Sequence, residues 1–202
     1  MDNRPIGVFD SGLGGLTVVR RLLELLPAED IVYFGDTGRV PYGTRSRETI
    51  EKYAEQDCRF LMGGGVKRII AACGTVSSTA PGVLERLPVP ACGVVEPAAD
   101  AALAASRSGR IGVIGTSATI RSGAFQRRIE AARPAVRVFA AACPLFVPLV
   151  ENGWIEPGDE VARAIVRRYM QPLKAEGIDT LILGCTHFPL LAPFLSEELG
   201  DE

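Results

Sequence analysis

Short apolar runs alternate with longer amphipathic stretches along the first half of the chain. The short runs predict buried strands over Ile6 to Phe9, Ile31 to Phe34 and Lys67 to Ala72. Helices are predicted between them, from Leu16 to Leu26 and from Arg47 to Gly63. The first helix has apolar positions Leu16, Val19, Leu22, Leu23 and Leu26, and the second carries Ile50, Tyr53, Ala54, Asp57 and Leu61 near one face. This β-α-β-α-β order predicts a parallel sheet covered by helices, with ligands at the carboxyl ends of the strands.

The second half of the chain repeats this pattern. The run Ile6 to Ser11 is echoed by Ile111 to Thr116, 105 residues later, and the strand that ends in Cys73 is echoed by one that ends in Cys185, 112 residues later. Two near-equal offsets of this length indicate a duplicated domain. We therefore predict an α/β fold of two similar lobes, each a parallel sheet flanked by helices, with the active site in the cleft between them. The lobes are assigned to residues 1–97 and 98–202.

Composition and charge narrow the class of ligand. The 202 residues are 47% hydrophobic, and 22 basic and 24 acidic residues give a net charge of -2. No basic stripe with interleaved aromatic residues is present, so no nucleic-acid partner is expected. The longest apolar stretch, Val138 to Val150, is broken by Pro144 and Pro148 and is too short to span a membrane. A small-molecule ligand is the expectation.

Cysteine usage indicates a reducing compartment. Five cysteines are present, and the segment Met1 to Pro5 has no apolar stretch of signal-peptide kind. Reduced thiols in the cytoplasm are therefore expected in place of a disulfide framework. No C-x-x-C spacing occurs and His187 is the only histidine, so no metal site is predicted.

Two of the cysteines stand out by their position. Cys73 and Cys185 each end a strand and are followed by polar residues, Gly74-Thr75 and Thr186-His187. Two thiols that face one carbon can remove a proton from one side and return it on the other. The hydroxyls of Thr75, Ser77 and Ser78 are predicted to cap the helix after Cys73, whose N-terminus would favour the thiolate. Cys58, Cys92 and Cys143 are interpreted as small buried apolar residues.

Three other features each allow two interpretations. The turn Asp10 to Gly15 has Thr17 where a dinucleotide-binding turn would have its third glycine, so it is either a nucleotide site or a tight turn that exposes Asp10 and Ser11. Asp36 follows the second strand and is either a turn or cap residue or part of the site. His187 either starts a helix or manages the proton of Cys185.

Sequence motifs along nearly the whole chain resemble those of one enzyme family. They are Gly7 to Gly15, Phe34 to Thr37, Val40 to Gly43, Ala72-Cys73, Gly93 to Pro97, Gly115-Thr116, Cys143 to Glu151 and Leu183 to Pro189. In this order they resemble the cofactor-independent, two-cysteine glutamate racemases of the aspartate/glutamate racemase family.

The resemblance implies that the chain interconverts L- and D-glutamate and supplies D-glutamate for peptidoglycan. Cys73 and Cys185 would alternate as thiolate base and thiol acid, assisted by Asp10 and His187, with Glu151 and Asp36 as further acidic residues. No cofactor or metal is implied, and a homodimer is the expected assembly. The implied substrate contacts are Asp10, Ser11, Pro41, Tyr42, Gly43, Gly74, Thr75, Thr119, Thr186 and His187.

Two departures from the family pattern keep alternatives open. Gly74 stands where the family usually has asparagine, and the family's usual C-terminal segment that returns to the first lobe is expected to be absent here. An unmade hydrogen bond to a charged ligand costs about 1–3 kcal/mol. The alternatives are an aspartate racemase, another two-thiol acid racemase or decarboxylase, and a catalytically weak glutamate-binding relative.

Overall fold

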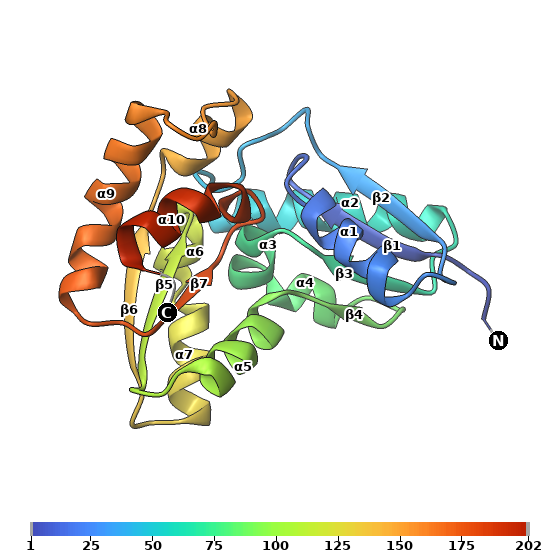
Figure 1. Cartoon of the computed structure of the whole chain (residues 1–202). Coiled ribbons are helices and arrows are strands. Elements are labelled where there is room, and N and C mark those ends of the chain that lie inside the picture. Colours follow the sequence, from blue (N-terminus) through green and yellow to red (C-terminus); the bar gives the residue numbers. More distant parts are fainter. Residues whose placement is uncertain (1, 201–202) are drawn as a thin grey trace. The chain divides into compact units, whose positions relative to one another are not determined.

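The structure, a computed structural model, describes residues 2–200 and divides into two compact units between Val94 and Val95. Each unit contains one sheet of parallel strands flanked by helices (Figure 1). The predicted α/β class with two similar lobes is therefore confirmed. Within residues 2–200, no helix combines the length and the apolar character that crossing a membrane would require.

The first unit is built on a four-stranded sheet with the order β2-β1-β3-β4. Its strands are β1 (Ile6–Asp10), β2 (Ile31–Gly35), β3 (Arg68–Ala71) and β4 (Ala91–Cys92). Its helices are α1 (Leu16–Leu25), α2 (Arg47–Gly63), α3 (Gly74–Thr79) and α4 (Pro81–Glu85). All five residues of β1 are buried, because this strand lies between two parallel neighbours and under helices on both faces.

The two faces of β1 pack against different helices. Ile6 and Val8 lie in one apolar cluster with Val18, Val19 and Leu22, which belong to α1. On the opposite face, a Cβ added at Gly7 would lie 3.1 Å from Val66 and 3.2 Å from Leu61, so the absence of a side chain lets α2 approach the sheet closely.

Helix α1 buries less of its apolar surface than its sequence pattern predicts. Val19 and Leu22 pack on the sheet as expected, whereas Leu16, Leu23 and Leu26 are 47%, 51% and 42% exposed. Apolar residues occupy more than half of the circumference of this helix, and a sheet can cover only the side that faces it. These three leucines therefore remain exposed.

The second unit repeats the strand arrangement of the first. Its sheet has the order β6-β5-β7, so the first strand in sequence is again central, with the second and third on either side. The strands are β5 (Arg110–Gly115), β6 (Arg137–Ala142) and β7 (Thr180–Leu183). The helices are α5 (Val95–Ala105), α6 (Ser117–Ser122), α7 (Ala124–Ala132), α8 (Phe146–Glu151), α9 (Glu160–Ala175), the 3-10 turn η1 (Phe188–Leu191) and α10 (Ala192–Leu199).

Strand β5 separates two apolar layers in this unit. Ile111 and Val113 pack with residues of α5 and α7, whereas Ile114 lies in a second cluster with α8, α9 and α10. The expected boundary between residues 97 and 98 falls inside α5, and this helix lies wholly in the second unit.

The five cysteines are all thiols, and they differ in exposure. Cys58 and Cys143 are buried, as predicted for small apolar residues. Cys92 is exposed, so the same interpretation was wrong for it. The reason is its place on β4, a two-residue strand at the edge of the sheet, where one side of the chain faces solvent.

Candidate active site

The first thiol lies where three segments of the first unit meet. Cys73 follows β3 and is the N-cap residue of α3. Strand β1 pairs with β3 and ends beside it, so the residues after β1 come close to this thiol. The Sγ of Cys73 lies 3.6 Å from the Oγ of Ser11.

Asp10, the last residue of β1, is fully buried beneath the turn that follows it. Its Oδ2 accepts a hydrogen bond of 3.0 Å from the backbone N–H of Gly12. A Cβ at Gly15 would lie 2.6 Å from the Cβ of Asp10, so the turn folds directly over this side chain. The expectation that the turn exposes Asp10 was therefore wrong, while Ser11 is half-buried.

Cys73 rests as a thiol. Burial raises its pKa to about 11, the negative charge of Asp10 adds to the increase, and the hydrogen bonds from Val76 and Ser11 only partly offset it. The first turn of α3 does lower this pKa through the backbone N–H of Val76, as expected, but burial has the larger effect, so the net shift favours the thiol.

The hydroxyls after Cys73 do not cap α3 as predicted. No side-chain hydrogen bond is made at its N-cap. Ser77 instead donates to the carbonyl of Ala71 at 3.0 Å, and Ser78 donates to the carbonyl of Thr75 at 3.2 Å. The bond from Ser77 ties α3 back to the end of β3 and so fixes the position of the segment that carries Cys73.

The second thiol has a different set of neighbours. Cys185 follows β7, and its Sγ lies 3.9 Å from the Nδ1 of His187. The Nε2 of the same imidazole lies 3.3 Å from Oε1 of Glu151, the last residue of α8. His187 is buried and also forms the N-cap of η1, so it both starts a helical turn and contacts the thiol. The thiol, the imidazole and the carboxylate form a chain along which a proton can be held or passed.

Replacing Glu151 tests this second chain of groups. If Cys185 is a reacting thiol, as the resemblance implies, we expect Glu151→Gln to lower kcat by roughly ten- to a hundredfold, because the imidazole loses the carboxylate that orients it. Steady-state kinetics and circular dichroism would separate this loss from misfolding. The matched control is Glu156→Gln, in the segment that follows α8. An unchanged kcat in Glu151→Gln would contradict the assignment.

The loop after β2 is held by its own side chains. Tyr42 is 1% exposed, and its phenol contacts the carboxylates of Asp36 and Asp57. Asp36 also accepts from the Nε of Arg39 at 2.5 Å. These contacts fit the turn interpretation of Asp36. Because the phenol of Tyr42 is engaged in these contacts, the loop can contact a ligand through the backbone of Pro41, Tyr42 and Gly43.

Three residues that hold the site in place were not predicted from the sequence. They are Arg39, Asp57 and Tyr33. Tyr33 donates a 2.6 Å hydrogen bond to the carbonyl of Gly12 and so supports the turn after β1. A signal for Asp57 existed in the sequence, since it is a charged residue on the apolar face of α2. Arg39 and Tyr33 carry no such signal, because basic residues are common on loops and aromatic residues are common in strands.

The remaining predicted contacts lie near strand ends within their own units. Gly74 and Thr75 are buried in the first turn of α3. Thr119 is buried in α6, where its backbone N–H donates to the Oγ1 of Thr116 at 3.2 Å. Thr186 is half-buried between Cys185 and His187. The first unit thus gathers Asp10, Ser11, Cys73, Gly74 and Thr75, and the second gathers Glu151, Cys185, Thr186 and His187.

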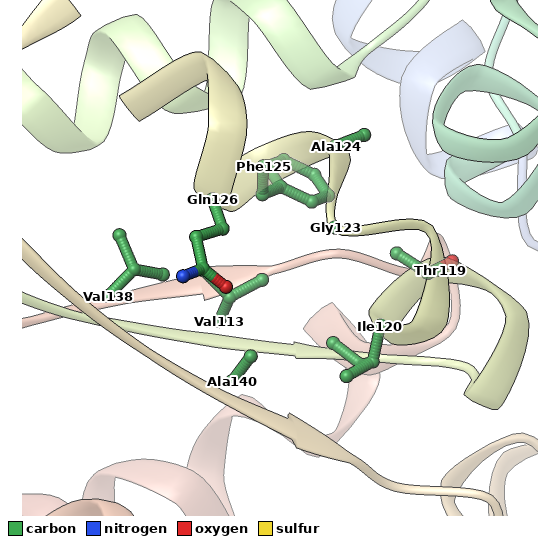
Figure 2. Close-up of a pocket in the computed structure, with 9 residues that line it drawn as sticks. All are labelled: Val113, Thr119, Ile120, Gly123, Ala124, Phe125, Gln126, Val138 and Ala140. Atoms are coloured by element: carbon green, nitrogen blue, oxygen red, sulfur yellow. The ribbon is translucent and has the colours of Figure 1, made fainter. Parts of the chain in front are cut away.

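A small cavity in the second unit is lined by Thr119, one of the predicted substrate contacts. Its lining combines residues of β5, β6, α6 and α7, and Figure 2 shows the amide of Gln126 between Val113 and Val138. The cavity volume of 20 Å³ is about the room that one water molecule needs. Neither Cys73 nor Cys185 lines it.

Comparison with known proteins places this arrangement in a family. A sequence model of the Asp/Glu/hydantoin racemases matches residues 6–202. A protein named glutamate racemase from Geobacter metallireducens is 49% identical over 200 residues, which are 98% of this chain and 73% of that protein.

Solved structures give the same result. The crystal structure of glutamate racemase from Francisella tularensis in complex with D-glutamate matches with a TM-score of 0.90 and 41% identity, over 98% of this chain and 74% of that one. A glutamate racemase isoform from Bacillus anthracis matches with a TM-score of 0.94 and 39% identity, over 100% of this chain and 75% of that one. The chain belongs to the Asp/Glu/hydantoin racemase family.

Proposed function

We propose that this chain is a glutamate racemase, an isomerase that interconverts L- and D-glutamate without a cofactor. The observation that carries the proposal is the equivalent placement of the two thiols. Cys73 and Cys185 each follow the third strand of a sheet with the same strand arrangement. The charge of Asp10 acts on the first thiol, and His187 lies beside the second. The relatives at 49% and 41% identity, both named glutamate racemase, support the choice of substrate.

The proposed reaction uses one thiol on each face of the α carbon. A thiolate removes the α proton and becomes a thiol, and the electron pair of the broken C–H bond stays on the carbon. The thiol on the opposite face then gives its proton to that carbon and becomes a thiolate. Configuration is inverted, one proton has been taken up and one delivered, and which cysteine acts as base depends on the enantiomer bound.

The neighbours of the two thiols have distinct proposed roles. Asp10 lies beneath the turn next to Cys73, and its negative charge raises the pKa of that thiol, which keeps Cys73 protonated at rest and makes its thiolate a stronger base once it has formed. His187 contacts Cys185 and can accept or return the proton of that thiol, while Glu151 orients the imidazole.

Substrate binding must make up for the weak acidity of the α carbon. Preorganised hydrogen bonds to both carboxylates and the exclusion of water are the means available to such a protein. The proposed donors are hydroxyls and backbone N–H groups at the strand ends. They are supplied by Ser11, Tyr42, Gly43, Gly74, Thr75, Thr119 and Thr186.

The missing side chain at Gly74 bears on whether glutamate or aspartate is the preferred substrate. It occupies the first position of α3, directly after Cys73, where a side-chain amide would be available to a ligand if asparagine were present. Without that amide, the preference for glutamate over aspartate must come from the other proposed hydrogen-bond donors. A racemase that prefers aspartate and a glutamate-binding protein without activity are the competing outcomes.

The cellular role follows from the proposed product. D-Glutamate would supply peptidoglycan synthesis, and with it cell-wall biogenesis and cell shape. The proposed place of work is the cytoplasm, where thiols such as Cys73 and Cys185 stay reduced. The homodimer expected from the sequence stays a prediction, to be measured by analytical ultracentrifugation.

Exchange of the α proton in heavy water tests the proposed function directly. The protein is incubated separately with L-glutamate, D-glutamate, L-aspartate and D-aspartate, and loss of the α-proton signal is followed by NMR. We expect both glutamate enantiomers to exchange and to racemise, faster than aspartate. Faster exchange of aspartate would reassign the substrate, and stabilisation by glutamate without exchange would leave only binding.

A further inference from the structure

Two buried carboxyl groups of the first unit meet at one phenol. Asp36 and Tyr42 lie in the loop after β2, and Asp57 projects from α2. The phenol oxygen of Tyr42 lies 2.9 Å from Oδ2 of Asp57 and also contacts Oδ2 of Asp36. Arg39 joins the same cluster, with its Nη2 2.8 Å from Oδ1 of Asp57 and its Nε 2.5 Å from Oδ2 of Asp36. The proposed reaction uses neither Asp57 nor Arg39.

The number of protons in this cluster decides its stability. A phenol has one O–H and can donate to only one of the two carboxyl groups. The other contact becomes a hydrogen bond only if that carboxyl group itself carries a proton and donates it to the phenol oxygen. With one such proton the cluster is neutral, since the charge of Arg39 balances the single remaining carboxylate. With both carboxylates ionised, a buried negative charge is left over.

We assign this proton to Asp57, the more deeply buried of the two carboxyl groups. Its side chain has no solvent exposure, whereas Asp36 is 7% exposed. Burial raises the pKa of Asp57 to about 6, and the neighbouring charge of Asp36 adds to the increase, against the lowering effects of Tyr42 and Arg39.

The groups around Asp57 are consistent with this assignment. The titratable and charged groups that act on it are Asp36, Arg39 and Tyr42 from the loop, and Cys58 lies next to it on α2. The guanidinium of Arg39 also lies 4.3 Å from the ring centroid of Tyr53 on α2, so the loop is tied to the helix at several points.

The cluster fixes the loop on which Pro41, Tyr42 and Gly43 lie. We propose that Asp57 is a positioning residue for the substrate, whose protonated carboxyl group holds Tyr42 and thereby sets the backbone of the Pro41 to Gly43 segment for glutamate binding. This inference rests on the proposed function. It assigns to Asp57 an effect on KM, since Asp57 acts through the loop and does not touch the reacting atoms.

The expected direction of the pH effect follows from the raised pKa. Folding favours the protonated carboxyl group, so the stabilising contribution is complete below pH 3.8, the ordinary pKa, and is lost as pH rises through about 6. In the wild type, KM for glutamate should therefore rise several-fold between pH 5 and pH 8 while the loop contacts weaken.

Two substitutions at Asp57 distinguish a role of its protonated carboxyl group from a role in packing alone. In Asp57→Asn the amide N–H can donate to Tyr42 and the amide oxygen can accept from Arg39, so this variant mimics the protonated acid at every pH. We expect its KM to match the wild type at pH 5 and to stay flat up to pH 8. In Asp57→Ala both contacts are lost, and KM should rise roughly tenfold with kcat within about twofold. The matched control is Glu55→Gln on the same helix, where the exposed carboxylate pairs with Arg86 at the surface, and it should behave as the wild type.

Kinetics and thermal denaturation of the full chain provide two independent readouts. The melting temperature of Asp57→Asn, relative to the wild type, should increase from pH 5 to pH 8, whether or not the protein is active. An Asp57→Asn variant with the pH profile of the wild type, in KM or in melting temperature, would overturn the shared proton. A KM raised as much as in Asp57→Ala would also overturn it, because the ionised carboxylate would then be the required form.

The same experiment distinguishes this inference from the proposed function. A wild type that does not racemise glutamate refutes the proposed function and the positioning role together, and the melting temperatures still decide whether the proton is shared. An active wild type with unchanged KM in both Asp57 variants refutes the positioning role alone. If Asp57→Ala does not fold, the pH profile of Asp57→Asn decides.

Discussion

Cys73→Ala and Cys185→Ala are each expected to lower the rate of glutamate racemisation by roughly two to four orders of magnitude, the usual contribution of a positioned acid or base. Racemisation needs a proton removed on one face and returned on the other, so the loss of either thiol interrupts both directions. Circular dichroism of each variant, incubated with L- and with D-glutamate, measures the rate.

Exchange in heavy water adds a sharper expectation for the same two variants. The remaining thiolate can still remove and return a proton on its own face, so each variant should exchange one enantiomer with retention, and the two variants should prefer opposite enantiomers. Cys92→Ala, at the exposed edge strand β4, is the control and should racemise as the wild type does. Wild-type racemisation in either thiol variant would refute the two-thiol reaction.

Gly35→Ala is expected to disrupt the turn that carries Asp10 and Ser11. A Cβ at this position would lie 2.3 Å from the backbone oxygen of Gly12, and a backbone atom cannot move aside as a flexible side chain can. The same oxygen accepts the hydrogen bond from Tyr33. We expect a loss of about 1–3 kcal/mol in the free energy of unfolding, typical of overpacked sites. A misplaced turn should also reduce kcat roughly a hundredfold.

Thermal denaturation and steady-state kinetics measure the two effects of Gly35→Ala. Gly38→Ala is the matched control, since a Cβ at Gly38 meets no atom within 4 Å, and its melting temperature and kcat should stay at wild-type values. If Gly35→Ala melts and turns over like Gly38→Ala, the close approach of the two backbones does not determine the geometry of the turn.

The alternation of apolar runs and amphipathic stretches was enough to predict most of the architecture. Helix α2 begins and ends at the predicted residues, and strands β1, β2 and β3 lie within one residue of the predicted bounds at each end. The repeat between the halves correctly indicated two sheets with the same strand arrangement. These successes share a physical cause, since a buried parallel strand must be apolar on both faces and so leaves a clear signal.

Burial and protonation could not be predicted from the local pattern. Asp10 ends a strand before a glycine-rich turn, and nothing in that sequence tells whether the turn opens or folds back over the side chain. The raised pKa of Cys73 depends on this packing, because both the burial and the nearby charge come from the tertiary structure. The exposure of Leu16 and Leu23 likewise depends on how wide a surface the sheet offers to α1.

The unlike surroundings of the two thiols have a consequence for the kinetics of a racemase. One thiol lies near a carboxylate and a hydroxyl, and the other near an imidazole. Mirror-image substrates have equal free energy in water, so their equilibrium constant is one and the ratio kcat/KM must be the same for both. The asymmetry of the protein can therefore change kcat and KM between the two enantiomers only by the same factor. The enantiomer with the higher KM must also be the one with the higher kcat.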